Sequence, residues 1–66
     1  MRIILNGEPR DVADSATVLG VLEGLGFNPE GTVVERNADI LDRASYATTA
    51  LAEGDTVELV RFVGGG

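Results

Sequence analysis

The chain contains no cysteine and no histidine. Without cysteine it can form no disulfide, thiolate nucleophile or zinc–thiolate site, and without histidine it lacks the commonest general base and the commonest metal ligand. It also contains no lysine, so all five basic residues are arginines and no side-chain amine is available for Schiff-base chemistry. These absences predict a protein that is not an enzyme and has no catalytic residues or metal site of its own.

The chain is acidic, with eleven carboxylate side chains against five arginines and a net charge of −6. This balance argues against nucleic acid, which selects clustered basic surfaces, and favours protein partners with positive surfaces. No apolar run approaches the ~20 residues that cross a bilayer, and no signal peptide precedes the first strand-like segment. We therefore expect a cytoplasmic protein that contacts neither nucleic acid nor membrane.

Three glycines, Gly64, Gly65 and Gly66, end the sequence directly after the apolar run 57–63. Glycine contributes no packing and loses more backbone freedom on folding than any other residue, so this segment adds nothing to a core. Extended from Val63 to Gly66, it reaches roughly 13 Å and has no side chains to block a narrow slot. One hypothesis is a carrier whose Gly66 carboxylate reacts inside another protein's active site, with Gly64 and Gly65 as the threading tail. A frayed end or an expression remnant is the alternative.

Sixty-six residues are enough for one small domain, here 1–63, followed by the flexible tail 64–66. The hydrophobic pattern predicts one helix over 18–25, because apolar residues recur there at i, i+3, i+4 and i+7. Thr17 is suited to cap its N-terminus and Gly26 its C-terminus. Strands are expected at five places: 2–5, 8–12, 32–36, 40–41 and 56–63.

The order of these segments predicts the fold. Asn6-Gly7 favours a hairpin between the first two strands, and Pro9, which cannot donate a ladder hydrogen bond, places the second strand at a sheet edge. The last strand is expected at the sheet centre, beside the first and parallel to it. The result is an α+β domain of the β-grasp (ubiquitin-like) type, with a mixed four- to five-stranded sheet packed on one main helix. The expected core is Ile3, Leu5, Val12, Val18, Leu22, Leu25, Ile40, Leu51, Val57 and Leu59.

Several short segments occur in an order typical of one family. They are the opening 3–7, the helix start at Thr17-Val18, the stretch 35–43, Gly54-Asp55 ahead of a strand, and the ending 63–66. Together they resemble the ThiS family, the small sulfur carriers of thiamin biosynthesis, over essentially all 66 residues. The chain departs from that family at three structural positions, where glycine, proline and tryptophan are frequent: Ala38, Asp42 and Tyr46.

The resemblance implies a chemistry in which the chain supplies no catalytic group. An adenylyltransferase of the ubiquitin-activating type (ThiF-like) uses ATP to convert the Gly66 carboxylate into an acyl-adenylate. A persulfide from a cysteine desulfurase system then displaces AMP and leaves a thiocarboxylate. That sulfur is delivered to a thiazole synthase (ThiG-like). ATP is used by the activating partner, and no cofactor is bound by the carrier itself.

A docking surface is expected beside the tail. Along the last strand, Val60 and Phe62 lie on one face of the sheet and Val57 and Leu59 on the other. If the helix covers Val57 and Leu59, then Val60 and Phe62 are exposed, beside Ile4. An exposed apolar patch next to a functional tail is typical of a partner interface, while ordinary surface or a homodimer contact is the alternative.

Three functions remain open from the residues. The first is a sulfur carrier for formation of the thiamin thiazole, favoured by the length and by the whole-chain resemblance. The second is a related carrier of the MoaD type, for molybdopterin or another sulfur pathway, although such chains are usually longer. The third is a β-grasp interaction module or protein-conjugated modifier for which sulfur transfer plays no part.

Overall fold

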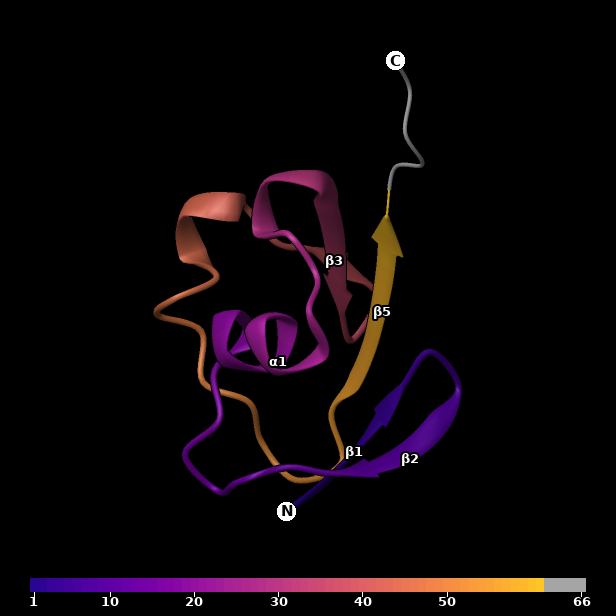
Figure 1. Ribbon diagram of the computed structural model, residues 1–66. Coiled ribbons are helices and arrows are strands. Elements are labelled where there is room, and N and C mark those ends of the chain that lie inside the picture. The colour runs from indigo at the N-terminus through magenta and orange to yellow at the C-terminus, as the bar shows by residue number, and fades with distance from the viewer. Residues whose placement is uncertain (62–66) are drawn as a thin grey trace.

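The computed structural model describes residues 1–61, which form a five-stranded mixed sheet packed against one helix (Figure 1). The strands lie in the order β2-β1-β5-β3-β4 across the sheet. β5 is parallel to β1 and antiparallel to β3, while the outer strands β2 and β4 pair antiparallel with their neighbours. This is the predicted β-grasp arrangement, with the last strand at the centre beside the first. In chain order the elements are β1 (Arg2–Leu5), β2 (Glu8–Asp11), α1 (Val18–Leu25), the 3-10 helix η1 (Pro29–Gly31), β3 (Thr32–Arg36), β4 (Asp39–Ile40), the 3-10 helix η2 (Arg43–Ser45) and β5 (Thr56–Arg61).

The β1–β2 hairpin turns at Asn6 and Gly7, whose φ angles are 49° and 83°. Two consecutive residues with positive φ are typical of the type I′ turn, whose twist matches that of the paired strands. β2 is an edge strand, as Pro9 predicts, and it ends at Asp11, one residue before the expected boundary.

Helix α1 begins and ends where the sequence predicts. The Thr17 hydroxyl oxygen accepts a hydrogen bond from the Gly20 amide at 3.1 Å. At the other end Gly26 has a φ of 78°, and its amide donates back into the last turn. Val18 and Leu22 are buried against the sheet. This packing holds the helix, since its two glycines give it a low intrinsic propensity.

The core lies between α1 and the sheet. Val12 and Leu25, both predicted core residues, are half-buried at its margin. Val34 and Tyr46 are buried although the sequence analysis did not assign them to the core. The buried apolar side chains are Ile3, Leu5, Val18, Leu22, Val34, Tyr46, Leu51, Val57 and Leu59.

Ile40 is not a core residue, so that prediction was wrong: its side chain is 70% exposed. The short strand β4 covers Asp39–Ile40 rather than 40–41, and Ile40 pairs with the exposed Glu35. The next residue, Leu41, is half-buried and packs against the core. Because successive strand residues face opposite sides of a sheet, one residue of difference in register exchanges the inward and outward positions.

Candidate functional site

The described structure ends at Arg61, three residues before the predicted reactive tail. Phe62 and the three glycines Gly64, Gly65 and Gly66 lie outside the described residues. β5 lies beside β3 (Figure 1). Arg61 is the last described residue of β5, and the register places it opposite Thr32 at the start of β3.

A cation–π contact and two hydrogen bonds hold the part of the fold next to Arg61 in place. The Arg61 guanidinium lies over the Phe27 ring, 4.3 Å from its centroid, in a cation–π contact. The Thr32 hydroxyl donates to the Asn28 carbonyl at 2.7 Å. The buried Tyr46 hydroxyl donates to the Thr32 carbonyl at 2.8 Å. These contacts tie residues 27–28, which precede η1, and Tyr46, which follows η2, to the β3–β5 pair, so the end of β5 is held on a rigid body.

Two asparagine side chains complete the hydrogen bonding of β5. The Asn6 side-chain oxygen accepts from the Leu59 amide at 2.7 Å, and the Asn37 side-chain oxygen accepts from the Thr56 amide at 2.9 Å. Both asparagines have positive φ, which is typical of turn residues, and the sequence analysis assigned Asn6 only to a turn. Their second role depends on the position of β5, which lies far away in the sequence.

Asp55 organises the turn that precedes β5. Its buried carboxylate accepts hydrogen bonds from the Ala52 amide at 2.8 Å, the Arg36 guanidinium at 2.9 Å and the Asn37 side chain at 3.1 Å. Burial alone would raise the pKa of this carboxyl, but the hydrogen bonds and the Arg36 charge outweigh burial and hold the pKa below its usual value. Asp55 is therefore an ionised structural anchor rather than an acid–base group.

The face of the sheet opposite α1, which we term the open face, carries Ile4 and Val60. Val60 is 56% exposed and Ile4 is half-buried. The two residues do not lie side by side: Ile4 pairs with Thr56, which is four residues from Val60, or roughly 13 Å along the strand. The cross-strand neighbour of Val60 is Val33 on β3. The apolar part of the open face near Arg61 is thus Val33 and Val60, and Val33 was absent from the sequence prediction.

An acidic pair follows this apolar pair on the open face. Glu35 on β3 lies opposite Glu58 on β5, and both are exposed. Like charges directly opposite one another weaken a strand pair, so the arrangement costs the free protein stability. It also gives the open face an apolar section beside a negative one, which matches a partner surface that has both apolar and basic side chains.

Residues 1–61 contain no group of three or more histidine, cysteine, aspartate or glutamate side chains placed to hold a metal ion. Within the same residues, none of the helices has the length and hydrophobicity needed to cross a membrane.

The sequence profile of the ThiS family matches residues 3–66. The chain belongs to the ThiS family. Membership of this family is consistent with the prediction, made from the missing cysteine, histidine and lysine, of a carrier rather than a catalyst.

Two relatives are much longer than this chain. It is 47% identical over 66 residues to the thiazole synthase of Magnetococcus marinus and 42% identical over 66 residues to that of Paramagnetospirillum magneticum. The match covers 100% of this chain and 20% of each synthase, so the chain spans about a fifth of their length. The sulfur carrier protein ThiS of Bacillus subtilis is 34% identical over 53 residues, which is 80% of each chain.

A solved structure confirms the fold. The crystal structure of the thiamine biosynthesis protein ThiS from Geobacter metallireducens matches with a TM-score of 0.84 and 36% identity, over 100% of both chains. The β-grasp topology of the sheet and helix is therefore that of the family.

Proposed function

We propose that this chain is a sulfur carrier of thiamin biosynthesis whose Gly66 carboxylate bears the sulfur. The observation that carries the proposal is the family match over residues 3–66, together with a ThiS structure that superimposes along the whole chain. The same match favours the thiamin pathway over the MoaD-type carrier and over a binding module without sulfur transfer.

The proposed reaction uses groups supplied by other proteins. An adenylyltransferase of the ubiquitin-activating type joins the Gly66 carboxylate oxygen to the α-phosphorus of ATP, and pyrophosphate leaves. A persulfide sulfur then attacks the acyl carbon and AMP leaves. Cleavage of the resulting acyl disulfide by a thiol gives the thiocarboxylate and a new disulfide. The carrier contributes recognition and reach, which is consistent with a chain that lacks nucleophilic and basic side chains.

The receiving partner in this proposal is a thiazole synthase. Support comes from the two synthases in which a segment similar to this entire chain makes up 20% of the protein. The open face with Ile4, Val33 and Val60 is the proposed surface on which partners dock beside the tail. Phe62, which the sequence also predicts as a contact, lies outside the described residues. Its exposed Val60 and its acidic pair support a contact that is partly apolar and partly electrostatic.

The proposal is tested by intact-mass measurement after incubation with an activating enzyme, ATP and a persulfide donor. We expect a mass gain equal to the replacement of one oxygen by sulfur, localised to Gly66. Deletion of Gly65 and Gly66 should abolish the gain, because the shortened arm no longer brings its carboxylate to the activated phosphate. The melting temperature should stay unchanged, since glycines add no packing.

An unchanged mass of the full chain would contradict the carrier function, provided that the same enzyme modifies another carrier in parallel. Full modification of the shortened chain would instead place the reacting carboxylate elsewhere.

A further inference from the structure

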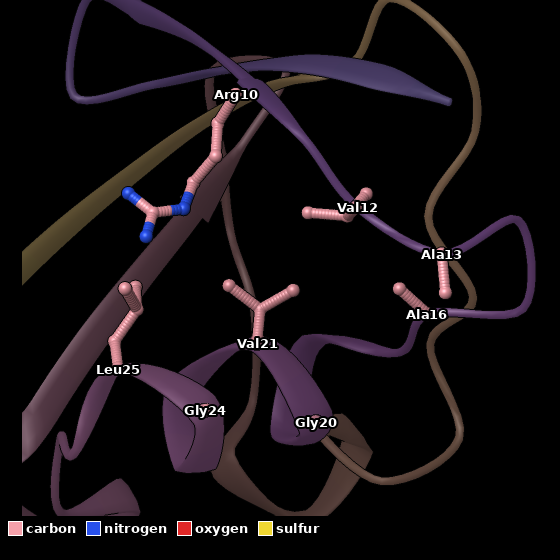
Figure 2. Close-up of a pocket in the computed structure, with 8 residues that line it drawn as sticks. All are labelled: Arg10, Val12, Ala13, Ala16, Gly20, Val21, Gly24 and Leu25. Atoms are coloured by element: carbon pink, nitrogen blue, oxygen red, sulfur yellow. The ribbon is translucent and has the colours of Figure 1, made fainter.

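A groove lies on the side of the sheet that faces the helix, between α1 and the strand β2 with the loop that follows it (Figure 2). Its volume is about 370 Å³. Val12, Val21 and Leu25 extend into it from opposite sides, and all three are half-buried. The groove is thus on the opposite side of the sheet from the open face. The residues that line it are Arg10, Val12, Ala13, Ala16, Gly20, Val21, Gly24 and Leu25.

The helical wall of the groove contains both glycines of α1. A glycine within a helix costs about 1 kcal/mol relative to alanine, and this helix has only eight residues. At Gly24 the fold gives no reason for that cost, because a Cβ atom placed there would meet no atom within 4 Å. At Gly20 it would come within 3.3 Å of the Thr17 hydroxyl oxygen. Gly24 therefore leaves the groove open to close approach by another molecule.

Arg10 supplies the only charge among the residues that line the groove. It pairs with Ile3 across the strands, so its side chain lies on the core side, and it extends toward Leu25 of α1 (Figure 2). Arg2 and Arg36 form ion pairs with aspartates, whereas within residues 1–61 the structure shows no hydrogen bond or ion pair for the Arg10 side chain. A guanidinium beside apolar side chains is suited to bind a carboxylate in two-pronged geometry.

We propose that this groove is a second docking surface, which holds a segment of the thiazole synthase body through one aliphatic side chain over Gly24 and one carboxylate on Arg10. The inference rests on the proposed function, because the synthase is the partner that the comparisons support. The two synthases that contain a similar segment share 47% and 42% of its residues, against 34% for the Bacillus carrier. A carrier segment within a synthase is always next to the synthase body. A contact on the helix side would hold it there while the open face and tail stay accessible.

The test measures the affinity of the full chain for the thiazole synthase of the same organism by isothermal titration calorimetry. Gly24→Leu fills the groove, and Arg10→Glu reverses its charge. We expect each variant to weaken binding roughly tenfold, which corresponds to about 1.4 kcal/mol. Gly24→Leu should not lower the melting temperature, because leucine favours the helix more than glycine does. A loss of binding by that variant therefore cannot be attributed to unfolding.

Two matched variants serve as controls. Arg43→Glu makes the same change of charge at an exposed arginine outside the groove, and Ala47→Leu adds apolar surface at an exposed position outside it. Both should bind the synthase as the unmodified chain does. Equal affinity of the groove variants and the controls would overturn the inference.

Three other experimental results would also overturn the inference. If the unmodified chain gains no sulfur in the mass assay, the proposed function fails, and the inference fails with it. If sulfur loading falls in the groove variants while synthase binding stays unchanged, the activating enzyme occupies the groove and the inference is wrong. If the chain alone forms oligomers that both groove variants disrupt, the occupant is a second copy, which also overturns it.

Discussion

Asp55 shows how one buried charge can set the geometry of a central strand. Its carboxylate joins the turn before β5 to the end of β3 through Ala52, Arg36 and Asn37. Because these donors stabilise the ionised form, the pKa of Asp55 lies below its usual value in the folded protein. A carboxyl with a lowered folded pKa stabilises the fold above its unfolded pKa, and this contribution is lost as the pH falls through the folded pKa.

We expect Asp55→Asn to lower the free energy of unfolding by about 1–3 kcal/mol at pH 7, because the amide cannot accept from all three donors. The difference from the unmodified chain should shrink as the pH falls below about 4, where the Asp55 of the unfolded chain becomes protonated. Urea unfolding followed by circular dichroism at pH 7, 4 and 3 measures both effects. A difference that stayed constant over this range would show that the charge of Asp55 does not contribute.

The backbone conformation of Ala38 lowers the stability of the folded protein. Its φ is 73°, a conformation that costs a residue with a Cβ roughly 1–2 kcal/mol but costs glycine little. The sequence resemblance indicated this position, since glycine is frequent there in the family.

Ala38→Gly should therefore raise the free energy of unfolding by roughly 0.5–1 kcal/mol, after the greater entropy of glycine in the unfolded chain is subtracted. The midpoint of urea unfolding is the measurement. The control is Ala47→Gly, at an exposed alanine that is not among the residues with positive φ, where the same change should destabilise. A loss of stability in Ala38→Gly would refute the strain at this position.

At the scale of the elements, the sequence predicted best the features that depend on neighbouring residues. The β1–β2 turn and both ends of α1 each follow from one or two residues with special backbone or capping chemistry. The alternation along β5 also predicted that Val60 would be exposed. The pairing of β3 with β5 depends on residues far apart in the chain, so Val33 and the acidic pair of the open face could not be identified from local patterns. The same limitation explains Ile40, whose direction depends on the register of an edge strand of two residues.

The acidic pair across β3 and β5 leads to a prediction for the sheet. Replacing Glu58 by Lys puts opposite charges across from one another, so we expect the free energy of unfolding to rise by about 0.2–1 kcal/mol. The gain should diminish at high salt, which screens exposed charges. Thermal unfolding at low and high ionic strength measures it.

Glu8→Lys is the matched control, because it makes the same change of charge on an edge strand opposite Leu5. An equal gain in both variants would show that the effect comes from the reduced net charge rather than from Glu35.

At the scale of the whole molecule, the sheet separates two surfaces of different character. The open face combines apolar and acidic residues, whereas the groove beside α1 is apolar with one arginine. The proposed function requires contacts with more than one enzyme, and a contact on one side of the sheet would leave the other side accessible. The two proposed docking surfaces therefore lie on opposite sides of one sheet.

β5 lies between β1 and β3, so in the described sheet it alone joins the N-terminal hairpin to the β3–β4 pair. A two-stranded hairpin is marginally stable by itself, and an unpaired strand edge promotes aggregation. During synthesis both pairs leave the ribosome before the strand that unites them. Any polypeptide whose translation stops before Thr56 would remain in two unjoined halves and would be open to proteolysis. Because β5 completes the sheet, we expect the full fold only in chains that contain it.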